Sequence, residues 1–230
     1  ALEDLVRHHA PNLPVQTLED VPMLEPDTGG PVPEDCRFDV PVMMYVGNLE
    51  SYQGIDLLLD GFARVDPVAT PAQLVIIGGT RVHIDAYRTR ADDLGLADRV
   101  SFLGPKPVAD LGSYLRAAAI TCSPRTQGRN TPMKIYSYLD SGRPLLATRL
   151  LTHTQVLDDE IAMLVDPEPD DMARGMTALL VDPDLGVRLA AAARPRVAAE
   201  FSPEAYTRKL NCFLAEEIEP RLPRRSALAV

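Results

Sequence analysis

The stretch SPRTQGRNTPMKIYSYLDSGRPLLAT, residues 123–148, joins a basic loop to a short helix and an apolar strand. The chain of 230 residues has a formal net charge of −10, yet residues 123–149 contain one acidic residue, Asp140. Its five basic residues are Arg125, Arg129, Lys134, Arg143 and Arg149. A helix amino terminus offers unpaired N–H groups and partial positive charge, so we expect a small anion to bind here.

The helix of this stretch has clear start and stop signals. Asn130 and Thr131 are good N-cap residues, and Pro132 suits the first helical position. Gly142, followed by a proline two residues later, ends the helix.

The two faces of this helix differ. Lys134 and Ser137 are three residues apart and share one face, while Ile135 and Leu139 share another. The apolar face can pack, and the other can present an ammonium and a hydroxyl to a cleft, as in a phosphate and sugar site. The alternative is a well-capped surface helix with solvated arginines.

Apolar runs and helical segments alternate on both sides of the stretch. The expected strands are 42–46, 73–78, 100–104, 119–123, 144–148 and 162–165. The expected helices are 54–65, 83–94, 108–118, the helix of the opening stretch, a short helix from His153, 169–181, 184–200 and 203–219. This alternation predicts an α/β fold with a parallel six-stranded sheet, helices on both faces and a helical C-terminus.

Ligands of such sheets bind beyond the carboxyl ends of the strands. The loop 47–54, GNLESYQG, lies there, and Gly47 and Gly54 would let its backbone approach a ligand. It matches neither the dinucleotide fingerprint nor the phosphate loop of NTPases, which argues against dehydrogenases and NTPases. The alternative is that these glycines only form turns.

The segment THTQ (152–155), which contains His153, also follows an expected strand. Thr152 and Gln155 fit a capping box, which predicts a helix start with His153 exposed in its first turn. The alternative places His153 at the cleft as a donor to a sugar or phosphate oxygen. No metal-binding cluster or Ser/His/Asp arrangement follows from the spacing.

Composition excludes several classes of protein. A pI near 4.9 argues against nucleic-acid binding or a general anionic-membrane binder. Three scattered cysteines, Cys36, Cys122 and Cys212, indicate free thiols in a reducing compartment, so the cytoplasm is expected. No apolar run is long enough for a transmembrane segment.

Five segments together resemble the carboxyl-terminal half of a group 1 retaining glycosyltransferase of the two-domain GT-B fold. They are YVGNLESYQGIDLLLDGFA (45–63), LVIIGG (74–79), VSFLGPKP (100–107), the opening stretch and FSPEAYTRKL (201–210). The resemblance covers 41–214. It implies a Rossmann-like domain that binds a nucleotide-diphosphate sugar (a UDP- or GDP-sugar), with no cofactor and no metal.

The resemblance also implies a division of the chain. Residues 1–9 look like a helix, 15–18 like a short strand, and 11–41 are rich in Pro, Asp and Glu. We expect 1–40 to be the end of a missing N-terminal domain plus a linker, and 41–230 to be the nucleotide-sugar-binding domain with a C-terminal crossover helix. The acceptor, a glycan, lipid or small molecule, would bind the missing domain. Without that domain the hexosyltransferase would be inactive, and any peripheral membrane attachment would run through it.

Four positions depart from the family pattern. The family usually has an arginine after the first loop glycine and a lysine before the second, where this chain has Asn48 and Gln53. Two family glutamates, by the donor sugar and on the ribose hydroxyls, are replaced by Arg129 and Ser137. We therefore predict that Arg129 and Lys134 meet the diphosphate and stabilise it as the leaving group. The predicted donor-binding residues are Gly47, Asn48, Gln53, Gly54, Gly104, Gly128, Asn130, Thr131, Ser137 and His153.

This pattern leaves two alternatives to a transferase. The lost glutamates would suit a non-catalytic nucleotide-sugar-binding module, and a GT-B sugar-nucleotide epimerase would need carboxylates and histidines in the cleft. All of these readings expect the loops 47–54 and 128–131 to lie side by side, with Lys134 and Ser137 facing the space between them.

Overall fold

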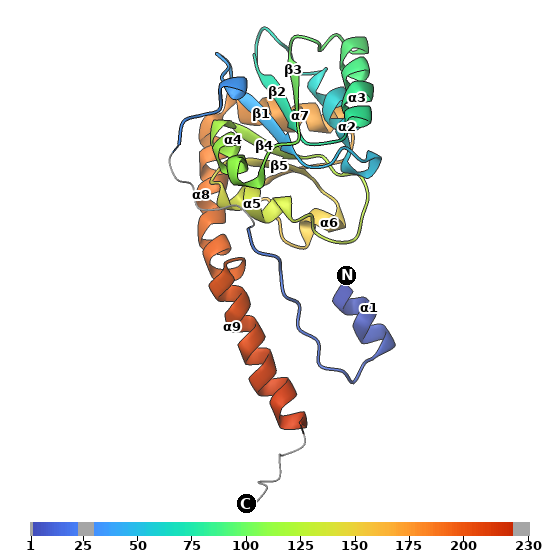
Figure 1. Cartoon of the computed structure of the whole chain (residues 1–230), viewed down its shortest axis with the longest axis vertical. Coiled ribbons are helices and arrows are strands. Elements are labelled where there is room, and N and C mark those ends of the chain that lie inside the picture. Colours follow the sequence, from blue (N-terminus) through green and yellow to red (C-terminus); the bar gives the residue numbers. More distant parts are fainter. Residues whose placement is uncertain (1, 23–29, 223–230) are drawn as a thin grey trace, which may run out of the picture.

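Six parallel strands form one sheet in the computed structural model, which describes residues 2–22 and 30–222 (Figure 1). In sequence order they are β1 (Val42–Val46), β2 (Gln73–Ile77), β3 (Val100–Gly104), β4 (Ile120–Ser123), β5 (Leu145–Thr148) and β6 (Met163–Val165). Their order across the sheet is β3-β2-β1-β4-β5-β6. The six strands predicted for the sheet are each confirmed to within one residue at either end.

The helices cover both faces of the sheet, as predicted. One face packs against α2 (Ile55–Phe62), α3 (Arg81–Asp93) and α7 (Pro169–Val181), and the other against α4 (Leu111–Ala117), α5 (Lys134–Asp140) and most of α8 (Pro183–Glu200). The four-residue helix α6 (Leu151–Thr154) follows β5.

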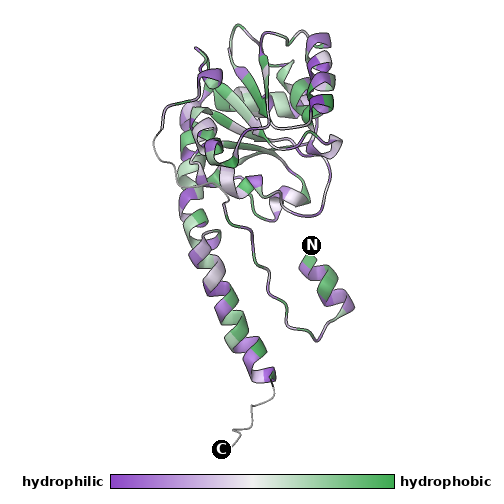
Figure 2. Ribbon diagram, viewed as in Figure 1, coloured by the Kyte–Doolittle hydropathy of each residue, from purple (hydrophilic) through white to green (hydrophobic). Residues whose placement is uncertain are grey.

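The central strands are buried on both sides, which explains their nearly continuous apolar sequence. Met43 and Tyr45 of β1 belong to one apolar cluster, and Met44 between them belongs to the other. Figure 2 shows the same contrast in colour, with hydrophobic strands and mixed helices around them. Alternate residues of one strand thus serve both cores.

The two ends of the described chain lie away from the sheet (Figure 1). Helix α1 (Leu2–His9) begins the described part, and α9 (Pro203–Phe213) continues as a π-helical turn through Ile218. The expected strand 15–18 was wrong: these residues are not in a strand, since no described strand pairs with them. Among the described helices, none is long and apolar enough to cross a bilayer. The prediction of free thiols is confirmed for all three cysteines.

Candidate functional site

The candidate site lies where β1 and β4 end. These strands are hydrogen-bonded neighbours although residues 47–119 separate them in the chain, so the loops that follow them meet at one edge of the sheet. The N–H of Thr126 donates to the carbonyl oxygen of Tyr52 at 3.0 Å and ties the two loops together. The loop 47–54 thus lies beside residues 124–126, at the point where the strand order reverses, whereas the expectation named residues 128–131.

Gly54 makes the contact between the loops possible. Its φ of +75° is left-handed, and a Cβ at this position would lie 2.0 Å from the carbonyl oxygen of Pro124. No side chain fits there, so the two backbones touch directly.

Lys134, the first residue of α5, reaches across to the β1 loop. Its Nζ donates to Oε1 of Gln53 at 3.1 Å and lies 3.9 Å from the ring centre of Tyr45. A Cβ on Gly47 would come within 2.7 Å of this Nζ, so the missing side chain at 47 leaves the room that the ammonium occupies. No carboxylate of the described residues forms an ion pair with it, and burial, reinforced by the charge of Arg125, lowers the pKa of Lys134 to about 7.

Arg125 is a second cation of this site, and its guanidinium is buried. It donates to the carbonyl oxygens of Gln127 at 2.7 Å and Asn130 at 3.3 Å, and it lies 5.1 Å from the ring centre of Tyr52. A buried cation needs such compensation, because leaving water is costly. The sequence did not predict Arg125 as a site residue, although Arg125 belongs to the basic stretch.

Two buried tyrosines shape the turn at Gly47. The hydroxyl of Tyr45 donates to the carbonyl oxygen of Asn48 at 2.6 Å. The hydroxyl of Tyr138 accepts the N–H of Val46 at 2.7 Å. Neither was predicted as a site residue, because a tyrosine in an apolar run has no signal beyond core packing.

Ser137 and Lys134 line one cavity of about 160 Å³, as expected, together with Val46, Val108, Leu111, Leu115, Met133 and Tyr138. A second cavity, of about 390 Å³, shares Val46 and Leu111 with the first and runs along the β1 and β2 loops past Gly47, Asn48 and Gly78. Gly104 ends the neighbouring strand, where its carbonyl oxygen accepts the Gly78 N–H at 2.8 Å.

The residues of the loop 128–131 do not line the cavity of Lys134 and Ser137. Gly128 packs on the guanidinium of Arg125, where a Cβ would lie 2.7 Å from Nη2. Arg129 is exposed and, with Asn130 and Thr131, lines a different cavity of about 400 Å³. That cavity faces the N-terminal segment and its acidic residues Glu3, Asp4, Glu19 and Asp20. The structure therefore brings Lys134 and Ser137 together but not Lys134 and Arg129.

The predicted capping of α5 was wrong. The helix begins at Lys134 after Met133, with no side-chain cap. The carbonyl oxygen of Pro132 instead accepts the N–H of Ile135 at 3.0 Å, and the amide of Asn130 is turned toward Arg125, with Oδ1 3.5 Å from its Nη2. The Asn130 side chain thus bonds within its own loop and does not cap the helix.

The prediction of an exposed His153 in a capping box was also wrong. Helix α6 begins at Leu151 after Leu150, with no side-chain cap, and His153 is fully buried. Its Nδ1 lies 2.8 Å from the carbonyl oxygen of Thr148 and its Nε2 lies 2.9 Å from Oγ of Ser123. A carbonyl only accepts, so Nδ1 carries the proton and Nε2 accepts from Ser123. Both ring nitrogens are thus occupied inside the protein rather than at the cavity.

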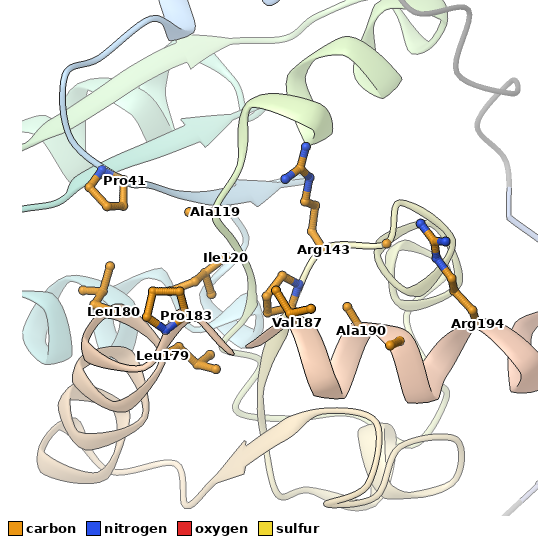
Figure 3. A pocket seen from close by; sticks show the side chains of 13 residues that line it. Pro41, Ala119, Ile120, Arg143, Leu179, Leu180, Pro183, Val187, Ala190 and Arg194 are labelled. Carbon is orange, nitrogen blue, oxygen red and sulfur yellow. The ribbon is translucent and has the colours of Figure 1, made fainter. Parts of the chain in front are cut away.

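A larger cavity, of about 570 Å³, lies at the opposite edge of the sheet (Figure 3). It is lined mainly by apolar residues at the amino ends of the strands and along α7 and α8, such as Ile120, Leu179 and Val187. The guanidinium of Arg143 donates to the carbonyl oxygen of Arg116 at the end of α4, at 2.5 Å. We do not include this cavity in the site, since ligands of parallel sheets bind at the carboxyl edge.

A six-stranded parallel sheet in this order, with helices on both faces, defines a Rossmann-like domain. The family model for glycosyl transferases group 1 matches residues 40–182, more than half of the chain. The chain belongs to this family, and its fold is that of the Rossmann-like carboxyl-terminal half of GT-B glycosyltransferases.

Three known proteins illustrate the similarity. Phosphatidyl-myo-inositol mannosyltransferase of Mycobacterium tuberculosis is 30% identical over 154 residues, which are 64% of this chain and 40% of that protein. D-inositol 3-phosphate glycosyltransferase of Acidothermus cellulolyticus is 31% identical over 158 residues, 64% of this chain and 35% of that protein. The structure of Anabaena HepE with UDP matches with a TM-score of 0.70 at 18% identity, over 77% of this chain and 49% of that one. This chain thus spans less than half the length of these proteins.

Proposed function

We propose that this chain is the donor-binding half of a glycosyltransferase that transfers a hexose from a nucleotide-diphosphate sugar with retention. The observation that carries the proposal is Lys134, an ammonium without a carboxylate partner among the described residues, held over a glycine loop at the carboxyl edge of the sheet. Lys134 is half-buried, and a cation partly removed from water without a counter-ion is unfavourable on its own and favourable beside an anion. The diphosphate of the donor would supply that anion.

The similar proteins support the class of donor. One relative is named a mannosyltransferase, and HepE has been solved with UDP and with UDP-glucose. A UDP- or GDP-sugar is therefore the proposed donor. The acceptor would bind a second domain outside residues 41–230, and the names of the relatives point to inositol-containing acceptors. The proposed location is the cytoplasm.

The residues of the site have separate roles in this proposal. Lys134 and the β1 loop would hold the diphosphate, and Ser137 in the adjoining cavity would hold the ribose. The buried guanidinium of Arg125 adds positive potential without occupying the cavity. Fixed cations at a leaving diphosphate stabilise the charge that develops as the sugar departs.

A specific observation also favours a non-catalytic sugar-nucleotide-binding module. No carboxylate lines the cavity of Lys134 and Ser137 in the described residues, and Ser137 itself stands where the family has a glutamate. The epimerase alternative has less support, because His153 is bonded inside the protein. A transfer assay on a protein in which this chain is joined to the proposed second domain distinguishes an enzyme from a non-catalytic binding module.

Lys134→Ala is expected to weaken binding of a nucleoside diphosphate about ten- to a hundredfold, because it removes a charge-assisted hydrogen bond. The free nucleoside should bind almost unchanged. Ser137→Ala should weaken both ligands alike if Ser137 holds the ribose. Calorimetric titration of UDP, GDP, uridine and guanosine measures these effects, with Lys209→Ala as control because Lys209 pairs with Glu19 at 2.5 Å. Equal losses of nucleoside and diphosphate in Lys134→Ala would contradict the diphosphate role.

The affinity measured in this titration should also depend on pH. The lowered pKa of Lys134 leaves the amine largely neutral above pH 7, whereas a bound diphosphate favours the ammonium. Binding then takes up a proton, and affinity falls as pH rises from about 7 toward the ordinary lysine value, by up to about tenfold per unit. Lys134→Ala should abolish this slope.

The isolated chain is expected to bind a nucleoside diphosphate weakly and to transfer no sugar, because half of the proposed cleft lies in another domain. Donor hydrolysis and transfer to an inositol-containing acceptor can be followed by mass spectrometry, with and without the second domain. Robust transfer by residues 1–230 alone would contradict the proposed division of the site.

A further inference from the structure

We propose that Tyr45 is the positioning residue of the phosphate site: its ring holds the Lys134 ammonium over the β1 loop while its hydroxyl fixes the direction of the Asn48 peptide. The inference rests on the proposed function, because it explains how the diphosphate site is kept ready. Tyr45 would not touch the ligand and would act through the two groups that it holds.

The ring supplies one half of this role. Tyr45 is fully buried in the middle of the sheet, so its ring has a fixed position beneath the site. The Lys134 Nζ lies 3.9 Å from the ring centre, within the distance at which a cation is attracted to an aromatic face. Gln53 holds the same Nζ from the side at 3.1 Å. The long lysine side chain is thus directed to one place before any ligand arrives.

The hydroxyl supplies the other half. It donates to the carbonyl oxygen of Asn48 at 2.6 Å, so this carbonyl points toward the buried ring. In a trans peptide the N–H lies opposite the carbonyl, so the N–H of Leu49 points away from Tyr45. That N–H has no acceptor among the described residues. An anion site requires this arrangement, because a carbonyl oxygen facing the diphosphate would repel it.

A neighbouring tyrosine shows that core packing alone does not explain these contacts. Tyr138 is equally buried, and its hydroxyl also bonds the backbone, at the N–H of Val46. It makes no contact with the Lys134 ammonium that the structure records. Because Tyr138 lines the cavity of Lys134 and Ser137, the control is Tyr114→Phe instead: Tyr114 is buried, its hydroxyl donates to the Asp35 carboxylate at 3.0 Å, and it lines neither cavity of the site.

The test compares Tyr45→Leu, Tyr45→Phe and Tyr114→Phe with the unchanged chain. UDP and GDP are compared first. The one that binds more tightly is then used together with its nucleoside. Tyr45→Leu removes both contacts and should lose about tenfold in diphosphate affinity, with nucleoside affinity unchanged. Tyr45→Phe keeps the ring and should lose about threefold. Tyr114→Phe should unfold at a lower temperature yet keep the ratio of the two affinities, because it removes a buried hydrogen bond away from the site.

A second readout follows Lys134 without any nucleotide. Its rate of acetylation, measured against pH by peptide mapping, reports the pKa of its amine. We expect Tyr45→Leu to raise this apparent pKa by at least one unit, because the released ammonium moves into water, and Tyr114→Phe to leave it unchanged. Identical acetylation profiles in Tyr45→Leu and Tyr114→Phe would overturn the inference. If the unchanged chain binds neither UDP nor GDP, the proposed function fails, while the acetylation profiles still decide the role of Tyr45.

Discussion

Gly54→Ala is expected to lower the free energy of unfolding by roughly 3–5 kcal/mol, which is a large part of the stability of an ordinary domain. Two effects add. An alanine with the left-handed φ of Gly54 is strained by roughly 1–2 kcal/mol. Its Cβ would also lie 2.0 Å from the Pro124 carbonyl oxygen, a backbone atom that cannot rotate aside. Urea unfolding followed by circular dichroism measures the change.

Gly95→Ala separates these two effects. Gly95 has a similar φ of +71°, but a Cβ there would meet no atom within 4 Å. We therefore expect it to show the strain alone. Gly54→Ala should in addition push the β1 and β4 loops apart, so diphosphate affinity falls in the molecules that remain folded. Equal destabilisation by the two substitutions would show that the contact with Pro124 is relieved at no cost.

Mild acid is expected to destabilise the fold through His153. Burial is the main cause that lowers the pKa of this imidazole from 6.5 to about 4, and the charges of Arg125 and Lys134 add to it. Below pH 6.5 the unfolded chain takes up a proton that the folded chain refuses. Stability is thus fully present above pH 6.5, falls as pH decreases, and has lost about 3 kcal/mol once pH passes below 4.

The measurement is the free energy of unfolding at pH 7, 5.5 and 4. Carboxylates also titrate in this range, so the informative quantity is the difference in pH dependence between the unchanged chain and His153→Asn. The asparagine amide can replace the Nδ1 donor but cannot take up a proton. It should be less stable at pH 7 and lose less stability on acidification. His9→Asn, at an exposed position of α1, should behave like the unchanged chain, and the same pH dependence in all three proteins would contradict the role of His153.

Most of the sheet could be predicted from the sequence because each strand is a short apolar run between helical segments. The prediction of a strand at 15–18 was wrong, because a strand needs a partner and local alternation of residues cannot supply one. The predicted start of α5 was wrong for a related reason. Asn130 has the chemistry of a cap, but its amide is turned toward Arg125, a contact that depends on how the whole loop folds.

The site was predicted best where a family position coincides with a local pattern. The spacing of Lys134 and Ser137 predicts one helix face, and both line one cavity; the loop glycine Gly54 predicts close approach, and its backbone touches that of Pro124. Arg125, Tyr45 and His153 could not be placed, because each owes its role to burial between segments far apart in the sequence. Charge alone cannot show whether an arginine lies in solvent or under a loop.

The central place of β1, between β2 and β4, also determines how the site behaves over time. Both loops of the site leave strands whose amides are bonded inside the sheet, so the points where the loops begin cannot move apart without separating the middle of the domain. Amide protons of Met43 and Tyr45 should therefore exchange with deuterium only through global unfolding. A nucleotide bound as proposed would meet loops whose starting points are already fixed, and its association should carry little entropy penalty for ordering them.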